Sequence, residues 1–492
     1  MLILSYVLIV CGLFKFGVDG VNPGAEIVLT QPGLTYAKNV GIEILKQQIH
    51  NIQIPDFSGS KSIYGYKISA IKITEFNVPE SQSSATILQG QGVQVKMGDV
   101  SIGLTGHYEA WLGSGWAKIT KSGSVQMSGT VNNAQVDGHF GDKNGRPTIA
   151  AANCAVSIGK IDVKFIGNIF DKIVDLFSGQ IGDAIKNALQ PQLCTIINGL
   201  LNNNANTWFQ SIPIDEKLPI PVAGTDFHIN YSMVDGPVFG ANFMRLDLRG
   251  ECYSQSARSP IIAPSVASFT IDPNVQIYIP LTTYPLDTAG YAILKSGLMS
   301  QTLTPADVDK IVPDGGKFLR TTCPGSACIG TIVPDIGKKY PNTTITLKTS
   351  SVDNVAPNFT INSMGIWLNG LGNVQFVTED TDTTILNINI GVKAIIMNLK
   401  FVTNADSYTI SGSTHTAGAS LTLRNTTLPD MTQSDLENIW RLLLMALIDG
   451  QLNNLVSAGI EIPAIPYVQI YNIQFKTLDK TLLISGDVKY TG

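Results

Sequence analysis

Charged residues are scarce in this chain of 492 residues, because Asp, Glu, Lys and Arg together make up only 14%. The formal net charge is -5, with 17 basic against 18 acidic residues in 22–250 and 15 against 19 in 251–492. A near-neutral first half and an acidic second half argue against nucleic acid as a partner. The 44% of hydrophobic residues excludes a disordered chain and is high for a soluble protein.

Long hydrophobic runs are absent after the first 20 residues. The most continuous one, 442–448, is far shorter than the ~20 residues that span a bilayer. Residues 1–20 have the apolar stretch and the small residues before cleavage of a secretory signal peptide, although Lys15 falls late and no positive charge precedes the stretch. A buried N-terminal strand is the alternative. We expect a secreted, extracellular, soluble protein.

Motifs of catalytic and metal sites are also missing. The chain has no G-x-S-x-G, H-E-x-x-H, P-loop or G-x-G-x-x-G sequence, and its five histidines are scattered singly. A triad assembled from distant segments would leave no such motif. We nevertheless expect no enzymatic activity, no metal and no cofactor.

Cysteine is sparse, and Cys11 belongs to the predicted leader. A bridge between Cys154 and Cys194 would join a strand-like segment to a helix and close a 40-residue loop, worth roughly 3 to 4 kcal/mol in chain entropy. Cys323 and Cys328 flank a turn-forming insert and can close a small ring, whereas their spacing and the lack of a nearby histidine disfavour zinc. Cys252 is then either buried and free or bridged to another molecule.

Four N-x-S/T sequons agree with a secretory route. They begin at Asn230, Asn342, Asn358 and Asn425. Each is a candidate glycosylation site, and three of the four lie in the second half.

The sequence lays out one plan twice. Each half contains an extended segment, an amphipathic helix, a run of strand-like alternation and a longer apolar helix. The helices are predicted over 34–51 and 166–201 in the first half and over 288–299 and 433–458 in the second. Pro191 should kink the second helix, and Ser434-x-x-Glu437 is predicted to cap the fourth as a capping box. The apolar stripes of these helices either pack on a sheet or line an apolar cavity.

Five short segments, spread from the start to the end of the chain, form a recognisable set. They are Asn22-Pro23-Gly24, Ile54-Pro55-Asp56-Phe57, Gly145-Arg146-Pro147-Thr148-Ile149, Gly250-Glu251-x-Tyr253-Ser254 and Gln469-Ile470-Tyr471-Asn472. Together they resemble the bactericidal/permeability-increasing protein and lipopolysaccharide-binding protein family, within the lipid-binding serum glycoprotein superfamily. In this resemblance Cys194 falls where the disulfide partner of Cys154 is expected.

The resemblance implies an α+β fold of two pseudo-symmetric domains. Each would be a twisted, barrel-like antiparallel sheet wrapped on two helices, and a central sheet would join them in a boomerang shape. The expected boundaries are 21–250 for the N-terminal lipid-binding domain, 251–274 for a Pro-containing linker with the central sheet, and 275–492 for the C-terminal lipid-binding domain.

The resemblance also implies that each domain holds a phospholipid in an apolar pocket. Burial of acyl chains gains about 0.8 kcal/mol per methylene, so a pocket of this kind needs no charge pairing. The residues predicted to line the pockets are Ile44, Ile173 and Phe177 in the first domain and Leu443 and Leu447 in the second.

Bactericidal members of the family present lysines and arginines on loops at the tip of the N-terminal domain, where lipopolysaccharide binds. The corresponding loops here, 58–67 and 106–121, have fewer cations and include Glu109. Two tryptophans in the second loop suit a membrane interface, or alternatively close the end of the barrel. The predicted tip residues are Lys61, Lys67, Lys118, Lys121, Trp111 and Trp116.

Three functions are compatible with these features. The preferred one is a secreted protein of innate immunity that binds lipopolysaccharide or other microbial lipids at a microbial membrane surface, with antimicrobial activity as in some family members. The second is a phospholipid carrier or transfer protein without endotoxin specificity, and the third is an interaction protein without lipid. Salt dependence separates the first two, because ions screen a lysine clamp but not apolar burial. We expect a monomer or a weak dimer.

Overall fold

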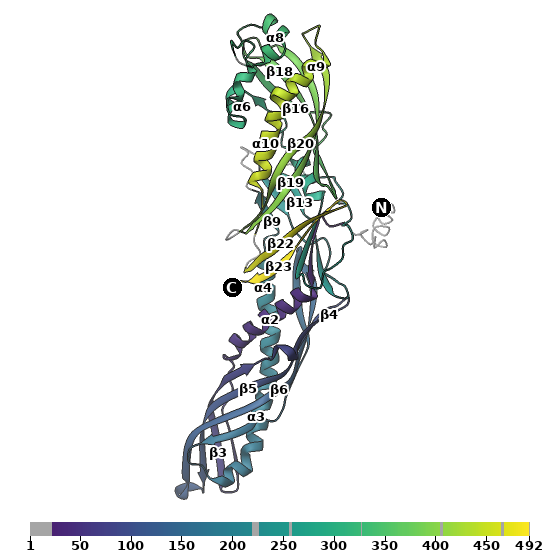
Figure 1. Ribbon diagram of the computed structural model, residues 1–492. Helices are drawn as coiled ribbons and strands as arrows, with labels where there is room; N and C mark the ends of the chain where they lie inside the picture. Colours follow the sequence, from purple (N-terminus) through teal and green to yellow (C-terminus); the bar gives the residue numbers. More distant parts are fainter. Residues whose placement is uncertain are drawn as a thin grey trace, which may run out of the picture.

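The computed structural model describes residues 22–218, 226–254, 258–325, 327–403, 407–463 and 467–491. The predicted signal peptide lies outside these residues. Figure 1 shows a long, gently bent molecule, with the N-terminal half of the chain at one end and the C-terminal half at the other. The α+β prediction is confirmed, since curled antiparallel sheets and long helices make up both ends.

A central sheet joins the two halves. Its six strands follow the order β11 (Val238–Phe239), β12 (Phe243–Leu248), β1 (Ala25–Thr30), β14 (Ile277–Thr282), β23 (Thr481–Tyr490) and β22 (Val468–Leu478). The first strand of each half, β1 and β14, pair antiparallel at the centre of this sheet, with Ala25 opposite Leu281 and Leu29 opposite Ile277. The pairing makes the two halves pseudo-symmetric about this junction.

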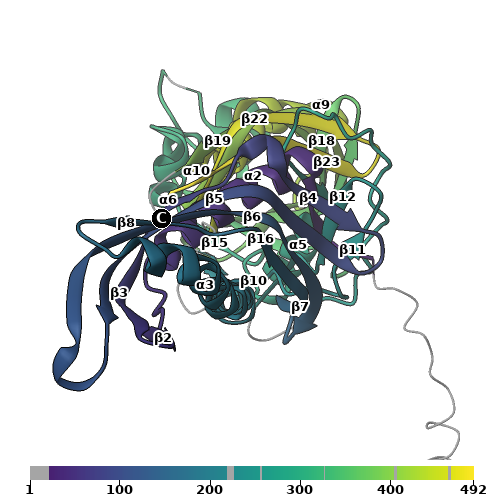
Figure 2. The same cartoon turned by 90° about the horizontal axis from the view of Figure 1, so that it is seen from below.

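The N-terminal sheet curls around one long helix, as Figure 2 shows in a view along the molecule. Its strands are β2 (Phe57–Lys61), β3 (Tyr64–Asn77), β5 (Gly92–Leu112), β6 (Ile119–Lys143) and β7 (Arg146–Ile158), with β4 (Ser83–Leu88) on β5 and β8 (Asp162–Ile166) on β6. The helices are α2 (Gln31–Ile49) and α3 (Asp171–Gly199), which continues through a π-helical segment (Leu200–Ala205) into α4 (Asn206–Ser211).

The C-terminal sheet has the same arrangement. Its strands are β15 (Thr302–Leu303), β16 (Ile345–Ser351), β18 (Gly365–Thr378), β19 (Thr384–Thr403), β20 (Ser407–Thr426) and β21 (Ile460–Pro463), with β17 (Asn358–Asn362) on β18. The long helix is α9 (Gln433–Ile439), a π-helical segment (Trp440–Leu444) and α10 (Met445–Ala458). Short helices α6 (Pro305–Ile311), α7 (Ile329–Ile332) and α8 (Pro334–Lys339) belong to the far end, where Figure 1 shows α6 and α8.

A small three-stranded sheet lies beside the junction. It contains β9 (Asp215–Leu218), β10 (Phe227–Asn230) and β13 (Glu251–Ser254), and it packs on α5 (Tyr284–Lys295). In the range 251–274, predicted as linker and central sheet, β13 therefore belongs to this smaller sheet, and the described residues after it carry no strand before β14.

The four predicted helices are present. The fourth has the predicted ends, Gln433 and Ala458, whereas the ends of the other three are shifted. The second begins at Asp171 and not at Ile166, because Ile166 pairs with Ser124 in β8 and Gly167, at φ 114°, ends that strand. The predicted capping box is wrong by two residues. Thr432 caps α9, with its Oγ1 accepting from the Asp435 amide at 3.2 Å. Helix α3 continues through Pro191 to Gly199.

Polar side chains of the long helices close a free sheet edge in each domain. At the edge of β7, Asn206 Oδ1 accepts from the Ile149 amide at 2.8 Å and Asn202 Oδ1 from the Ala151 amide at 2.7 Å. The disulfide between Cys154 and Cys194 lies on the same strand and helix. In the second domain, Asp449 and Asn453 of α10 accept from amides of β20. These contacts satisfy strand amides that would otherwise invite pairing with another chain.

Candidate functional site

The predicted tip residues lie on two neighbouring hairpins at the end of the N-terminal domain. Strand β3 pairs with β5, which places Tyr64 opposite Leu112 and Lys67 opposite Glu109. The Gly113 amide donates to the Ile63 carbonyl at 2.8 Å and so joins the turn after β5 to the turn between β2 and β3. Two loops that are about 50 residues apart in sequence therefore form one surface, which we call the hairpin tip (residues 61–67 and 111–121).

Three of the four predicted lysines at the hairpin tip have partners within the chain. Lys67 Nζ lies 3.4 Å from Asp56 Oδ2, so part of its charge is neutralised. Lys118 Nζ lies 4.2 Å from the centroid of the Trp111 ring, and Lys121 Nζ lies 4.3 Å from that of Phe170. Lys61 is exposed at the end of β2. The cations of the hairpin tip are therefore partly engaged within the chain.

Apolar side chains at the hairpin tip face solvent. Trp116 is 100% exposed, Ile119 59% and Ile63 49%. Trp111 lies against Gly65, its partner on the neighbouring strand. A Cβ atom at position 65 would collide with the indole ring, so this packing requires the glycine. The two tryptophans therefore have different environments: Trp111 packs on the hairpin, whereas Trp116 does not close the barrel. Sequence reasoning missed the two isoleucines, whose only signal is their position beside turns.

The residues predicted to line the first pocket are only partly together. Ile173 and Phe177 of α3 are fully buried in the N-terminal core, where the Phe177 ring lies 4.8 Å from that of Tyr66. Ile44 is half-buried on α2, because Ile42 and Leu45 occupy the inward positions of that helix.

The inner face of the C-terminal sheet contains a gap between two apolar clusters. On β18, Ile366 belongs to the cluster near the central sheet and Phe376 to the cluster under α9 and α10, and both are buried. The inward positions between them, including Leu368, Gly370 and Gly372, are only half-buried. A Cβ atom at position 370 would meet no heavy atom within 4 Å. The sheet therefore leaves room on its inner face for apolar chains.

Of the two pocket residues predicted in this domain, Leu447 is buried in the cluster under α9 and α10. The side chain of Leu443 lies outside the described part of the chain. The gap was not predicted from sequence, although the alternate glycines of β18 are its signal, since glycine within a strand marks missing side-chain packing.

A groove of about 540 Å³ lies where the N-terminus of α2 meets the segment before β14. Its volume is in the range of small-molecule sites. Both polar and apolar residues line it, and sequence reasoning missed it because they come from three distant segments. They are Thr30, Gln31, Pro32, Thr35, Tyr36, Asn39, Asn242, Ile271, Pro273 and Gln276.

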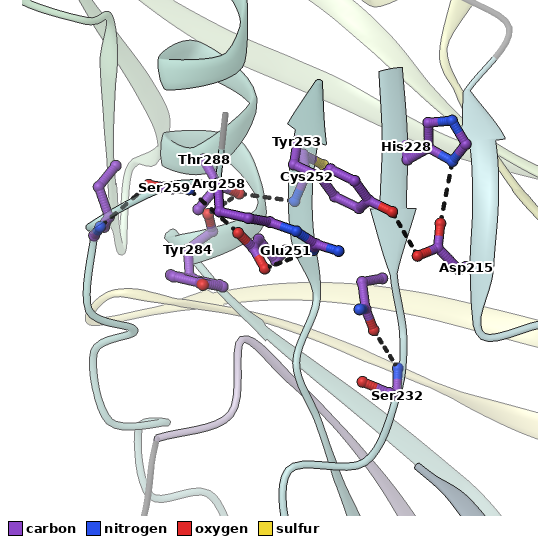
Figure 3. Close-up of polar contacts among 12 residues, drawn as sticks. Asp215, His228, Ser232, Glu251, Cys252, Tyr253, Arg258, Ser259, Tyr284 and Thr288 are labelled. Carbon is purple, nitrogen blue, oxygen red and sulfur yellow. Dashed lines mark hydrogen bonds and ion pairs between the residues drawn. The ribbon is translucent and has the colours of Figure 1, made fainter. Parts of the chain in front are cut away.

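A polar cluster covers the three-stranded sheet, as Figure 3 shows. Asp215 accepts a hydrogen bond from the Tyr253 hydroxyl at 2.5 Å, and its other oxygen lies 3.1 Å from His228 Nδ1. The Arg258 guanidinium stacks 3.4 Å from the centroid of the Tyr253 ring and donates to the buried Glu251 at 3.0 Å. These contacts fasten the start of the linker to the sheet, which is a structural role.

The neighbouring Cys252 is a buried, free cysteine, which settles the alternatives left by the sequence. Burial, and secondly the charge of Glu251, raise the pKa of its thiol to about 12, so it stays protonated and unreactive. Its backbone amide donates to Thr288 Oγ1 of α5 at 2.9 Å. Within the described residues no group of three His, Cys, Asp or Glu side chains is placed to hold a metal ion.

The other four cysteines in the described part of the chain form the two expected disulfides, Cys154–Cys194 and Cys323–Cys328. Among the sequons, Asn342, Asn358 and Asn425 are exposed. Asn230 is half-buried, and its Oδ1 accepts from the Ser232 amide at 2.8 Å. In the described helices, no segment combines the length and the hydropathy needed to cross a bilayer.

Two family-wide sequence patterns match this chain, the N-terminal domain of the LBP / BPI / CETP family over residues 33–204 and its C-terminal domain over residues 223–490. The chain belongs to the LBP / BPI / CETP family. The LBP / BPI / CETP resemblance read from short segments is therefore confirmed, and so is the two-domain fold that it implied.

Relatives within the LBP / BPI / CETP family are distant. The chain is 24% identical to a bactericidal permeability-increasing protein of Sebastes schlegelii, with 96% of each chain covered, and 24% identical to a lipopolysaccharide-binding protein of Mus musculus, with 96% and 95% covered. It is 23% identical to a phospholipid transfer protein of Homo sapiens over 62% of this chain and 59% of the relative. A crystal structure of lipopolysaccharide binding protein superposes with a TM-score of 0.66 at 22% identity, covering 96% of this chain and 100% of the other.

Proposed function

We propose that this protein is a secreted lipid-binding protein of innate immunity that binds lipopolysaccharide or related microbial lipids at the hairpin tip and holds phospholipid in apolar pockets. The observation that carries the proposal is the union of two distant hairpins into one surface with lysines and exposed apolar side chains together. In this function the protein catalyses no reaction, and it binds lipid as a monomer or a weak dimer.

The chemistry of the hairpin tip fits an anionic lipid surface. Lysines attract phosphates through charge, while Trp116, Ile119 and Ile63 can enter the boundary between head groups and acyl chains. Neither part is strong alone, because Lys67, Lys118 and Lys121 already have partners and their charges are screened by salt. Their combination favours a microbial membrane or an endotoxin aggregate over a free phosphate.

Phospholipid is the ligand that we propose for the apolar interior. The gap at Leu368, Gly370 and Gly372 gives the second domain room for acyl chains, each methylene of which gains about 0.8 kcal/mol on burial. For the first domain the proposal rests on the resemblance, with Ile173 and Phe177 on the wall of the pocket.

Secretion is supported by the covalent chemistry of the chain. Its two disulfides are typical of an oxidising compartment, since cytosolic thiols are kept reduced. The leader-like residues 1–20 and the three exposed sequons agree with the same route.

A second candidate function is that of a phospholipid carrier or transfer protein without endotoxin specificity. The observation that favours it is the partial engagement of the lysines at the hairpin tip, which leaves little free positive charge. Apolar pockets alone would then determine binding.

The test is a competition between lipopolysaccharide and phosphatidylcholine vesicles at low and physiological salt. We expect preferential binding of lipopolysaccharide that weakens with salt, and a loss of about thirtyfold in the double variant Lys118→Ala, Lys121→Ala, since each of the two charge-assisted contacts contributes on the order of 1 kcal/mol. Trp116→Ala should weaken binding at both salt concentrations. Lys143→Ala is the matched control, because this exposed lysine lies at the opposite end of β6.

Equal binding of both lipids that ignores salt, with the lysine variant unchanged, would overturn the endotoxin proposal and favour the carrier. Absence of any lipid from protein purified from a secreting cell, together with no vesicle binding, would overturn both.

A further inference from the structure

The outer face of the C-terminal sheet is rich in side-chain amides. Strand pairing places Asn373 opposite Asn389, Gln375 opposite Asn387, and Asn387 opposite Asn425 on the next strand. Their sequence neighbours point the other way, since alternate residues of a strand face opposite sides, and residues such as Phe376 and Ile388 are buried under α9 and α10. The amides therefore share the face that the helices do not cover.

Carboxylates are missing from this face. The five strands β16 to β20 contain no Asp or Glu. Among the cations of these strands, Lys348 binds Asp382 at 2.8 Å and Lys393 lies 4.7 Å from the Trp367 ring. Lys400 and Arg424 are exposed as well. The surface thus has a few cations and no strand carboxylate, and its amides can form many hydrogen bonds, which does not suit a basic partner.

The amides retain free hydrogen-bonding groups. Asn373 Nδ2 donates to Asn389 Oδ1 at 2.8 Å and also to Asn387 Oδ1. These contacts use the oxygens of Asn387 and Asn389, and within the described residues neither of the two Nδ2 groups is assigned a partner. Amide donors in such a row match sugar hydroxyls, which both donate and accept.

Two sequons lie on the borders of the same face. Asn358 and Thr360 are outward residues of β17, and Asn425 is an outward residue of β20. The Oδ1 of Asn358 accepts from Asn369 Nδ2 at 3.2 Å, which leaves the nitrogen that would carry a glycan free. Asn425 is exposed beside Asn387.

We propose that N-linked glycans on Asn358 and Asn425 lie across the outer face of the C-terminal sheet, with sugar hydroxyls hydrogen-bonded to the amides of Asn387 and Asn389. The occupant is the chain's own carbohydrate because it is attached at two borders of the face, so the sugars are held there at a high effective concentration. The proposal rests on the secretory route proposed above.

The experiment uses the full-length protein secreted from eukaryotic cells. Site occupancy is measured by mass spectrometry of glycopeptides, and the rate of glycan release by peptide-N-glycosidase is measured on the native protein. Asn342 is the internal control, because it is exposed on a turn before β16 and outside the amide face. We expect occupancy at all three sites, with release from Asn358 and Asn425 about fivefold slower than from Asn342, as when one net hydrogen bond must break first.

The double variant Asn387→Ala, Asn389→Ala tests the amides directly. It should bring the release rates at Asn358 and Asn425 to that of Asn342, with the Asn342 rate itself unchanged. If this variant does not fold, the release rates at the three sites of the unaltered protein still test the proposal. Glycan on Asn342 with none on Asn358 and Asn425, or equal native release rates at the three sites, overturns this proposal alone. No glycan at any sequon of the secreted protein also overturns this proposal alone, whereas a full-length chain that is retained in the cells and is not secreted overturns the secretory route.

Discussion

Among single residues, Glu26 occupies an unfavourable position in the central sheet. It is only 6% exposed, and its Oε1 lies 3.7 Å from Arg245 Nε, which is itself bound to Asp247 at 2.6 Å. Burial raises the pKa of Glu26 from 4.5 to about 6, with Arg245 opposing the shift and Asp247 adding to it. At pH 7 this carboxylate is therefore charged at a cost to the folded state.

We predict that Glu26→Gln stabilises the protein at pH 7 by up to about 2 kcal/mol, since one pKa unit corresponds to 1.36 kcal/mol. In the unaltered protein, Glu26 takes up its proton at a higher pH in the folded state than in the unfolded state. The free energy of unfolding should therefore increase as the pH is lowered from about 6 to 4.5. Urea unfolding across this range measures both effects. A variant that is less stable at pH 7 would contradict the prediction, and Asp247→Asn, which removes a partner of Arg245, serves as the destabilising control.

The sequence predicted single residues well where chemistry alone identifies them. Both disulfides are found as expected. Ile44 shows the limit, because a stripe of apolar residues leaves the rotation of the helix undetermined by one position, and packing against the sheet selected Ile42 and Leu45. The exposure of Ile63 and Ile119 depends on the pairing of two distant hairpins, which no local pattern contains.

For whole elements, hydrophobic periodicity found all four long helices but the ends of only the fourth. The strand that ends at Ile166 depends on pairing with β6, and the cap at Thr432 depends on one side-chain contact. A pattern of apolar residues contains neither kind of information. The edge-closing role of the long helices was also missed. Asn202 and Asn206 resemble residues of a solvent-facing surface in the sequence, yet in the structure they complete the hydrogen bonding of β7.

We predict that the double variant Asn202→Ala, Asn206→Ala lowers the free energy of unfolding by about 2 to 3 kcal/mol, because amides and a carbonyl at the β7 edge lose their partners. Alanine has the higher helix propensity, so any loss arises at the strand edge and not from the helix itself. Chemical denaturation monitored by tryptophan fluorescence provides the measurement.

Asn204→Ala is the control for that prediction, since Asn204 is exposed in the same π-helical segment. Its stability should match that of the unaltered protein. Equal stabilities of the double variant and this control would show that the edge contacts contribute nothing.

In the whole molecule, the duplicated plan predicted two similar domains and the family resemblance implied a central sheet between them, and this is what the chain forms. What the duplication did not predict is a difference between the halves. Each core has a large cluster along its long helix and a smaller one near the central sheet, but Val95 packs against both clusters of the N-terminal domain, whereas Gly370 and Gly372 lie between those of the C-terminal domain. Such a gap forms only where neighbouring strands place small side chains at the same level of the sheet, and this depends on the strand register.

We predict that Gly370→Leu reduces the phospholipid that copurifies with the secreted protein to about half, because a leucine would fill one of the two proposed pockets. Gly418→Leu is the matched control. It also has no heavy atom within 4 Å of the new Cβ position, but Gly418 is exposed opposite Lys393 on the outer face. Lipid extraction followed by mass spectrometry gives the load, and equal loads in the two variants would refute the assignment of the pocket.

The pairing of β14 with β23 determines when the molecule can be completed during synthesis. The N-terminal barrel uses residues that are close in sequence and can form as soon as they leave the ribosome. Strand β14 begins at Ile277, yet its partner β23 starts only at Thr481, so one side of the central sheet stays open until the last residues have been made. Long-range pairing of this kind slows folding and exposes a strand edge meanwhile. Truncation of the last ten residues should therefore appear first as a failure of secretion.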